Sequence, residues 1–229
     1  MKSLNEQDFA TLRRRMVEVI EFEFDLVTDE TQRMGLGAGL REALLAVPRH
    51  MFVPPALAPL AYQDRPLPIG FDKTISQPFI GALMVELLDL DESSRVLEVG
   101  TGLGYLTAIL GRLAAEVYSV EIVEEFVDAA RARLRELGYG NVAARVGDGS
   151  RGWDDAAPFD AIVVSAAATE IPQALARQLA EGGRLVLPLE VAGSQRLVRA
   201  VRADGHLLIQ EVLPVAFTKL ETLFRPEPT

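Results

Sequence analysis

Apolar residues recur at spacings of three and four along the first part of the chain, which predicts an amphipathic helix with Asp8 as its candidate N-terminal cap. The residues that would share the buried face are Phe9, Leu12, Met16, Ile20 and Phe24. The opposite face is acidic and is most simply a solvated surface. Glycines at positions 35, 37 and 39 end this helix before a shorter second one that ends at Pro48. Between Pro54 and Pro68 prolines are so frequent that we expect neither helix nor strand.

From Pro78 onward, short apolar runs alternate with amphipathic segments. A helix is predicted from Pro78 to Leu88, and the helices expected after it span residues 104–113, 123–137 and 172–180. Gly138 would end the second of these three helices, and Gly182 and Gly183 would stop the third. The strands expected between them span residues 95–99, 117–120, 142–146, 159–165 and 184–189. Such alternation is typical of an α/β fold, a mostly parallel sheet with helices on both faces.

The last third of the chain has a different pattern. Residues 195–202 and 206–215 read as two strands, joined by the turn signal Ala203-Asp204-Gly205. We therefore expect a C-terminal antiparallel hairpin appended to the parallel sheet.

Composition removes several classes of function. The 33 acidic and 23 basic residues give a net charge of −10, the wrong sign for holding a nucleic-acid backbone. The chain has no cysteine and two histidines, which excludes disulfides and thiolate metal sites, and we expect no metal. The longest stretch without a charged residue, between Glu98 and Arg112, is shorter than the about 18 residues of a membrane span. The N-terminal residues MKSLNEQDFA contain no apolar run that would act as a secretion signal, so we expect a soluble, cytoplasmic protein without a membrane partner.

A glycine-rich turn joins the first predicted strand of the sheet to the helix after it. The sequence VLEVGTGLGYLTAIL places Gly100, Gly102 and Gly104 at this turn, where backbone can approach a ligand and the helix N-terminus offers unpaired amides. Taken alone, the turn is weak evidence, because a tight strand-to-helix connection needs glycine for steric reasons.

Three acidic residues near the ends of successive strands give the turn a context. Glu98 precedes the glycines, Glu121 ends the next strand, and Asp148 follows the third strand within Gly147-Asp148-Gly149. An acid in the position of Glu121 can accept hydrogen bonds from both hydroxyls of a ribose, and Asp148 could accept from an adenine amino group. No phosphate-binding lysine follows the glycines, and the loop holds no arginine. A cationic nucleoside without phosphates fits best, and S-adenosyl-L-methionine is such a molecule.

The methyl acceptor is indicated by what is absent and by one unusual segment. After the fourth strand the chain continues as Ser165-Ala166-Ala167-Ala168, without the Asn/Asp-Pro-Pro-aromatic run of enzymes that methylate amino groups of nucleic acids. Upstream, Thr74-Ile75-Ser76-Gln77-Pro78 opens a helix with a hydroxyl and free amides, which together could hold a carboxylate. The alternative, that Ser76 is only a helix cap, stays open on these grounds.

With these residues in view, the chain resembles the protein-L-isoaspartate O-methyltransferases. The resemblance runs from about Val47 to Leu220, through VPRHMFVP, AYQDRPLPIG, TISQPFI, the glycine segment, VYSVE, GDG, FDAIVVSAAA and GGRLVLP. It implies a Rossmann-like S-adenosylmethionine-dependent methyltransferase fold in a single domain. Residues 1–75 would form a helical cap and substrate loop, 76–190 the cofactor-binding core, and 191–229 the hairpin and tail. The implied activity is methyl transfer to the free carboxylate of L-isoaspartyl residues in damaged proteins or peptides, a repair reaction.

The resemblance also implies a set of site residues. The active-site serine falls on Ser76. Cofactor contacts are expected from Thr74, Ile75, Gln77, Glu98, Gly100, Thr101, Gly102, Gly104, Tyr105, Glu121, Ile122, Asp148 and Gly149. Substrate contacts are expected from Leu67, Pro68, Ile69, Ser165 and Ala166.

Two segments depart from the family pattern and leave alternatives open. Residues 31–39 look inserted, and the C-terminal run has Ala216 and Lys219 where the family usually has arginine and proline. These departures motivate an alternative, a related O-methyltransferase acting on aspartate or isoaspartate of one dedicated peptide. A second alternative is a binding module that holds S-adenosylmethionine without catalysis, although the presence of Ser76, Glu121 and Asp148 argues against it. The oligomeric state is not indicated by the sequence.

Overall fold

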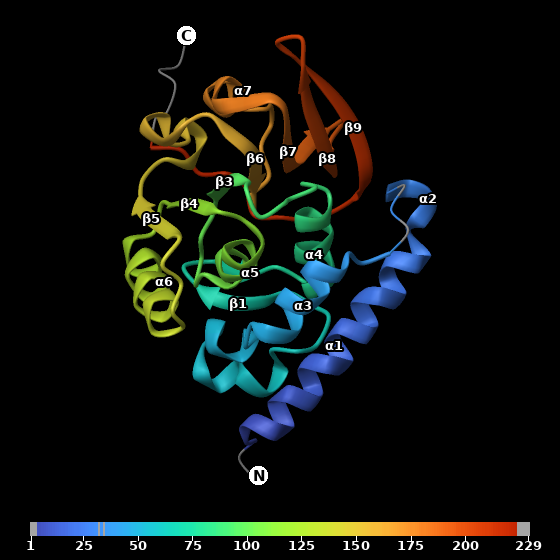
Figure 1. Ribbon diagram of the computed structural model, residues 1–229, viewed down its shortest axis with the longest axis vertical. Coiled ribbons are helices and arrows are strands. Elements are labelled where there is room, and N and C mark those ends of the chain that lie inside the picture. The colour runs from blue at the N-terminus through green and yellow to red at the C-terminus, as the bar shows by residue number, and fades with distance from the viewer. Residues whose placement is uncertain (1–3, 32, 34, 224–229) are drawn as a thin grey trace.

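A seven-stranded sheet forms the centre of the molecule in this computed structural model, which describes residues 4–31, 33 and 35–223 (Figure 1). The strand order is β5-β4-β3-β6-β7-β8-β9. The strands are β3 (Arg95–Val99), β4 (Glu116–Glu121), β5 (Val142–Val146), β6 (Phe159–Val164), β7 (Leu179–Val191), β8 (Ser194–Ala203) and β9 (His206–Pro214). Neighbouring strands are parallel from β5 through β7, whereas β7, β8 and β9 pair antiparallel. The predicted α/β fold with a C-terminal antiparallel hairpin is confirmed.

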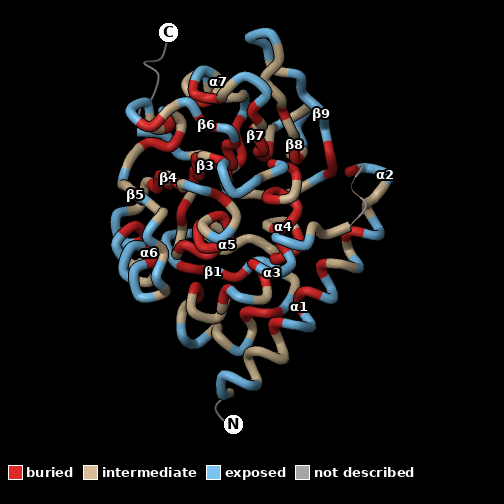
Figure 2. Tube along the Cα trace, viewed as in Figure 1, coloured by how far each residue is buried: buried red, intermediate tan, exposed pale blue. Residues whose placement is uncertain are grey.

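Successive side chains of the sheet point to opposite faces, and each face has its own core. On β3, Val96 packs into the larger core with residues of α1 (Glu6–Leu26), α3 (Ala38–Ala46), α4 (Pro78–Glu86), α5 (Tyr105–Leu113) and α6 (Glu124–Glu136). The next residue, Leu97, packs into the second core with Leu175 of α7 (Gln173–Gln178). Buried positions accordingly run along the central strands in Figure 2. Helices therefore cover both faces, with most of them on one.

Both tight turns of the C-terminal meander have positive φ at their two central residues, as type I′ hairpins require. Asp204-Gly205 joins β8 to β9 and was expected, whereas Ala192-Gly193 joins β7 to β8 and was not. Alanine is uncommon at a positive φ, so the second turn carries a weaker sequence signal. The parallel core therefore continues directly into a three-stranded antiparallel extension.

The first helix begins one turn earlier than the sequence indicated. Its cap is Asn5, whose side chain accepts a hydrogen bond from the Asp8 amide at 3.0 Å, while Asp8 bonds back to the Asn5 amide. The prediction that Asp8 is the cap was wrong, because Asp8 occupies the third position of a capping box. A short helix, α2 (Thr28–Thr31), follows α1, and within the segment 31–39 Gln32 and Met34 lie outside the described residues.

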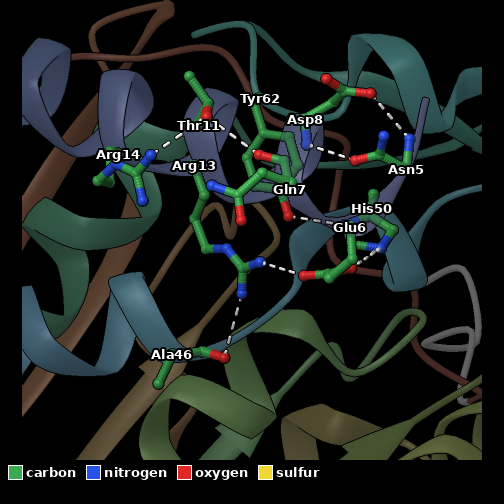
Figure 3. A network of polar contacts seen from close by, with 10 residues as sticks. All are labelled: Asn5, Glu6, Gln7, Asp8, Thr11, Arg13, Arg14, Ala46, His50 and Tyr62. Carbon is green, nitrogen blue, oxygen red and sulfur yellow. Dashed lines mark hydrogen bonds and ion pairs between the residues drawn. The ribbon is translucent and has the colours of Figure 1, made fainter.

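A polar network ties the start of α1 to the proline-rich segment (Figure 3). Arg13 donates to Glu6 and to the Ala46 carbonyl, and His50 shares a hydrogen bond of 2.7 Å with Tyr62. The proline-rich segment was expected to hold neither helix nor strand, and that prediction was wrong. The 3₁₀ helix η1 (Arg49–Phe52) precedes the segment, η2 (Pro55–Leu60) lies within it, and the strand β1 (Leu67–Gly70) begins at its end and pairs with β2 (Lys73–Ile75). Proline is compatible with the first turn of a short helix, which explains the error.

Helix α7 is shorter than its apolar pattern indicated. It begins at Gln173 and ends at Gln178, and Leu179 already pairs with Phe159 of β6, so the expected helix over 172–180 was one residue too long at its start and two at its end. The buried Gln178 side chain donates to the Arg151 carbonyl and accepts from the Trp153 amide. These long-range bonds stop the helix before the glycines that were expected to end it. In the part of the chain that the structure describes, no helix is long and apolar enough to cross a membrane.

Candidate active site

Three adjoining cavities lie where the carboxyl ends of the central strands meet β1, β2 and the C-terminal segment. The glycine-loop cavity is lined by Gly100, Gly102, Glu121, Gly149 and the segment Thr218–Glu221, among others. The outer cavity, of about 410 Å³, is lined by Ser76, Gln77, Ile80 and the segment Pro214–Thr218, among others. The inner cavity between them is lined by Arg49, Ser76, Thr101 and Tyr105, among others. Thr74 and Ser165 line all three, so the cavities form one continuous site.

Glycines of the turn, and Gly149 after β5, lie where a side chain would be crowded by neighbouring residues. A Cβ atom on Gly100 would lie 3.3 Å from that of Ser165, and one on Gly149 would lie 2.2 Å from Val99 Cγ1. Gly100, Gly102 and Gly104 all have positive φ, and Gly102 faces Ile69. Gly104 differs in its surroundings, because it packs against Ala130 of α6 and does not line the cavities. Its place in the site is therefore to start α5, while Gly100 and Gly102 form the wall that a ligand would touch.

Glu121 is the last residue of β4, and its carboxylate reaches the glycine loop. Its Oε2 accepts a hydrogen bond from the Gly102 amide at 2.9 Å, and its Oε1 accepts from the amides of Ile122 and Val123 at 2.9 and 3.1 Å. A carboxylate has about four acceptor positions, so about one, on Oε2, is left for a further donor. Glu121 and Ile122 line the glycine-loop cavity, where that position can meet a ligand hydroxyl.

Glu98 lies beneath the loop and does not line the cavities. It is fully buried, and its Oε2 accepts hydrogen bonds from the Thr107 and Ser119 hydroxyls at 2.5 and 2.6 Å. Burial raises the pKa of Glu98 to about 7, although the two hydroxyls oppose that shift. Its Oε1 is buried without a hydrogen-bond partner among the described residues. The expected cofactor contact of Glu98 stays a prediction, and the structure gives it a supporting place under the turn.

Asp148 is held by its own chain on both oxygens. Oδ1 accepts from the amide and hydroxyl of Ser150 at 3.0 and 2.6 Å, and Oδ2 accepts from the Leu223 amide at 2.9 Å. The C-terminal strap, residues Thr218–Leu223, therefore covers this carboxylate. The strap is also bound to Ala167, which donates to the Thr218 carbonyl and accepts from the Leu220 amide at 2.8 Å each. An ion pair between Lys73 and Glu221 ties it to β2.

The turn that carries Ser76 is fixed from two sides. Arg49 donates to the Ser76 carbonyl at 2.6 Å, and Asp64 accepts from the Phe79 amide at 2.8 Å and from the Gln77 side chain. The cap of α4 is Gln77, without a side-chain capping bond, so Ser76 is not the cap of that helix. The turn offers fewer free amides than expected, since Pro78 has none and Asp64 takes that of Phe79. The half-buried Ser76 hydroxyl forms no hydrogen bond within the described residues and lines the outer and inner cavities.

The remaining expected site residues divide by position. Those that line at least one cavity are Ile69, Thr74, Ile75, Gln77, Thr101, Tyr105, Ser165 and Ala166. Within β1, Leu67 is buried and Pro68 is exposed, and neither lines the cavities. Lining residues that the sequence did not single out include Lys73, Phe126 and Arg49. The only signal for Arg49 was its place within VPRHMFVP, which names no contact.

The geometry thus combines a glycine-lined cavity, a carboxylate at the second strand end and a serine turn on one continuous surface. A model of the protein-L-isoaspartate(D-aspartate) O-methyltransferase family matches residues 25–223. The chain belongs to this family. The expected resemblance is thereby confirmed over most of the sequence.

Named relatives and solved structures agree with this assignment. A protein-L-isoaspartate O-methyltransferase 1 of Polaromonas sp. is 44% identical over 220 residues, covering 96% of this chain and 93% of the relative. A protein-L-isoaspartate O-methyltransferase of Anaeromyxobacter dehalogenans is 54% identical over 185 residues, covering 80% and 88%. A crystal structure of a Plasmodium falciparum member, in complex with S-adenosyl-L-homocysteine, superposes with a TM-score of 0.72 at 25% identity and covers 81% and 91%. Another structure, of a protein-L-isoaspartate O-methyltransferase, has a TM-score of 0.78 at 28% identity and covers 90% of this chain and 65% of that one.

Proposed function

We propose that this protein uses S-adenosyl-L-methionine to methylate the free carboxylate of L-isoaspartyl residues in damaged proteins or peptides. Family membership over residues 25–223 supports the activity. The observation within the molecule that carries it is the meeting of the glycine-loop cavity and the outer cavity at Thr74 and Ser165, beside Ser76. A cofactor and a peptide could thus reach one another from opposite sides of the serine turn.

The residues around the glycine-loop cavity fit the cofactor. Gly100, Gly102 and Gly149 line the cavity without side chains. A Cβ atom on any of them would crowd Ser165, Ile69 or Val99, so these positions keep the backbone accessible to a nucleoside. Glu121 lines the cavity and retains an acceptor position for a ribose hydroxyl. Asp148 lies at the next strand end but does not line the cavity, and its Oδ2 accepts from the Leu223 amide. The negative charge of Glu121 also favours a positively charged ligand. When bound, S-adenosylmethionine supplies an electrophilic methyl group, which a carboxylate oxygen accepts as the bond from that methyl to sulfur breaks.

The chain's own contribution to the chemistry is positioning. A carboxylate is ionised at neutral pH, so no residue has to remove a proton from it. We assign to the Ser76 hydroxyl the role of donating a hydrogen bond that holds one carboxylate oxygen and leaves the other directed toward the cofactor side. A hydroxyl that has no hydrogen-bond partner among the described residues can make that bond. Its worth lies in orientation, since misplacement of a reacting group by about 1 Å can cost a factor of about 100 in rate.

The outer cavity is the proposed entrance for the peptide. It is wide, and among the described residues no charged side chain lines it. Residues 214–218 form one wall, which includes Ala216, one of the two positions where the chain departs from the family pattern. The other position, Lys219, lines the glycine-loop cavity instead. An uncharged wall does not select for the charge of the residues that flank the isoaspartate. This favours a broad range of damaged proteins over one dedicated charged peptide.

The deciding experiment compares an isoaspartyl peptide with its normal aspartyl twin of the same sequence. We expect methyl transfer from labelled S-adenosylmethionine to the isoaspartyl peptide alone, and comparable transfer when the flanking residues are changed. Transfer to the aspartyl twin, or to one flanking sequence only, would support the dedicated-substrate alternative instead. Cofactor binding without transfer to either peptide would support a binding module.

The role of Ser76 has its own test. Replacing Ser76 with alanine should lower kcat on the isoaspartyl peptide by a factor of about 10 to 1000, the range for losing one preorganised donor. Affinity for S-adenosylhomocysteine, measured by calorimetry, should change little, because the serine hydroxyl does not line the glycine-loop cavity. Activity of the unmutated enzyme should persist below pH 7, since no enzyme base needs to lose a proton. An alanine variant as fast as the original enzyme would remove Ser76 from the mechanism.

A further inference from the structure

Arg49 is a buried cation whose hydrogen bonds go to main-chain carbonyls. Its side chain lies in η1 and is 1% exposed. The Nε atom donates to the Ala61 carbonyl at 2.8 Å, and Nη2 donates to the Ser76 carbonyl at 2.6 Å. The guanidinium is rigid and planar, so these two bonds tie the end of η2 to the serine turn at a fixed separation. Bonds from a charged donor of this kind are stronger than those between neutral groups.

The positive charge of Arg49 has no carboxylate partner. Among the described residues it forms no ion pair, and its guanidinium carbon lies 4.7 Å from the centre of the Tyr105 ring. Asp64 attracts it at longer range, but that carboxylate is bonded to Gln77 and Phe79. An unpaired buried charge is costly to keep. Burial lowers the pKa of Arg49, yet an arginine remains protonated in proteins.

The charge also faces the site. Arg49 lines the inner cavity together with Ser76, Gly102 and Tyr105. An anion that reaches Ser76 therefore enters the field of a cation that forms no ion pair among the described residues. In a largely buried setting such attraction is much stronger than in water. The substrate carboxylate is the anion that the proposed reaction brings to this place.

We propose that Arg49 is a positioning residue for methyl transfer, which holds the turn carrying Ser76 and supplies the positive charge that the isoaspartyl carboxylate meets. The inference rests on the proposed function and deepens it. The two parts act on different kinetic constants. The two guanidinium hydrogen bonds, to the Ala61 and Ser76 carbonyls, determine where the Ser76 hydroxyl lies, so losing them lowers kcat. The charge stabilises the bound carboxylate, but that carboxylate becomes a neutral ester in the reaction, so the charge acts mainly on KM.

Two substitutions separate these parts. Arg49→Lys keeps the charge but has no planar fork to span both carbonyls, and Arg49→Met removes both. We expect kcat on the isoaspartyl peptide to fall by a factor of about 10 to 100 in each variant. KM for the peptide should rise about five- to tenfold in Arg49→Met and little in Arg49→Lys. The matched control is Arg202→Lys. Arg202 likewise donates to main-chain carbonyls, those of Ala176, Arg177 and Leu179, and it lines none of the three cavities.

A double-mutant cycle distinguishes positioning from general support of the fold. If Arg49 acts through the Ser76 hydroxyl, Arg49→Lys should lower kcat by less than about threefold when Ser76 is already alanine. An equal loss in both backgrounds, or an Arg49→Lys enzyme with unchanged kcat, would overturn the positioning role. A KM as low in Arg49→Met as in Arg49→Lys, or a loss confined to S-adenosylhomocysteine affinity, would overturn the role of the charge.

The same cycle keeps this inference apart from the proposed function. A Ser76→Ala enzyme without any loss of rate would refute the role assigned to Ser76, whatever the Arg49 variants do. A slow Ser76→Ala enzyme with unaffected Arg49 variants would refute the inference alone. Should Arg49→Met fail to fold in circular dichroism, Arg49→Lys and the cycle still decide the positioning part.

Discussion

Glu98 is the residue whose surroundings differ most from a simple ligand contact. The sequence placed it beside the glycines, and the structure buries it beneath them with one oxygen lacking a partner. The Thr107 and Ser119 hydroxyls both donate to the other oxygen, and Ser119 also bonds to Thr101 of the loop. The carboxyl group thus connects β3, β4 and α5 under the turn. Its protonation should affect the stability of the whole arrangement.

The pH dependence of that stability has a definite sign. Folding raises the pKa of Glu98 from 4.5 to about 7, so the folded state binds this proton more tightly than the unfolded state. The resulting stabilisation is complete below about pH 4.5 and is lost as pH rises through 7, by about 3 kcal/mol at most. In Glu98→Gln, urea unfolding measured from pH 5 to 8 should show a smaller decrease in stability with pH. Glu136→Gln, an exposed acid on α6, is the control, and equal slopes in all three proteins would contradict the prediction.

Individual site residues were predictable from the sequence where their role depends on residues close to them in the chain. Gly100 and Gly102 follow from a turn between two recognisable elements, and Ser76 from a short segment that is specific to the family. Arg49 and Asp64 were not predictable as a pair, because each acts on a turn that lies far from it in the sequence. The bond between Leu223 and Asp148 spans a still longer separation. Only the folded chain brings such partners together.

At the scale of elements, apolar pattern predicted the strands of the core closely. The expected strands 95–99 and 142–146 coincide with β3 and β5. β3 is a buried central strand and was recognisable from its apolar residues. β5 is an edge strand with one buried residue, and it was recognisable from its place between a helix end and the next turn. Failures came where a tertiary contact overrides local preference. Gln178 ends α7 through its bonds to Arg151 and Trp153, and β7 begins before the glycines that were expected to separate helix from strand.

The glycine loop is the element on which cofactor binding depends most directly. Gly102 has φ +51, lines the cavity, and would place a Cβ atom 3.3 Å from Ile69 Cδ1. Gly102→Val should therefore weaken S-adenosylhomocysteine binding by at least about tenfold in calorimetry, while the fold persists with about 1 to 3 kcal/mol of added backbone strain. Gly138→Val is the matched control, because Gly138 also has positive φ but would place its Cβ atom with nothing within 4 Å, and it lines none of the three site cavities. Unchanged affinity in Gly102→Val would place the ligand elsewhere.

At the scale of the whole molecule, the glycine-loop cavity is lined by segments from before, within and after the parallel core. Lys73 of β2 precedes the parallel core, the glycine loop belongs to it, and the C-terminal strap follows the antiparallel extension. The Lys73–Glu221 ion pair joins the first of these to the last, across the cavity they both line. A ligand in that cavity would touch all three, so its binding should stabilise the chain as one unit.

This coupling leads to a thermal test of the strap. S-adenosylhomocysteine at about 100 times its Kd should stabilise the protein by about 2.7 kcal/mol, which raises Tm by roughly 5 to 11 °C for a chain of this size. Lys73→Met removes the ion pair but leaves the strap's bonds to Ala167 and Asp148. If the looser strap weakens affinity tenfold, the rise in Tm should fall by about half at the same ligand concentration. Without ligand, Lys73→Met should lose no more than about 1 kcal/mol, as other single ion pairs do. Arg41→Met, which breaks the Arg41–Glu21 pair between α3 and α1, controls for ion-pair loss away from the site. A ligand-induced rise in Tm that is the same in Lys73→Met, Arg41→Met and the unmutated protein would show that the strap stays closed without its ion pair.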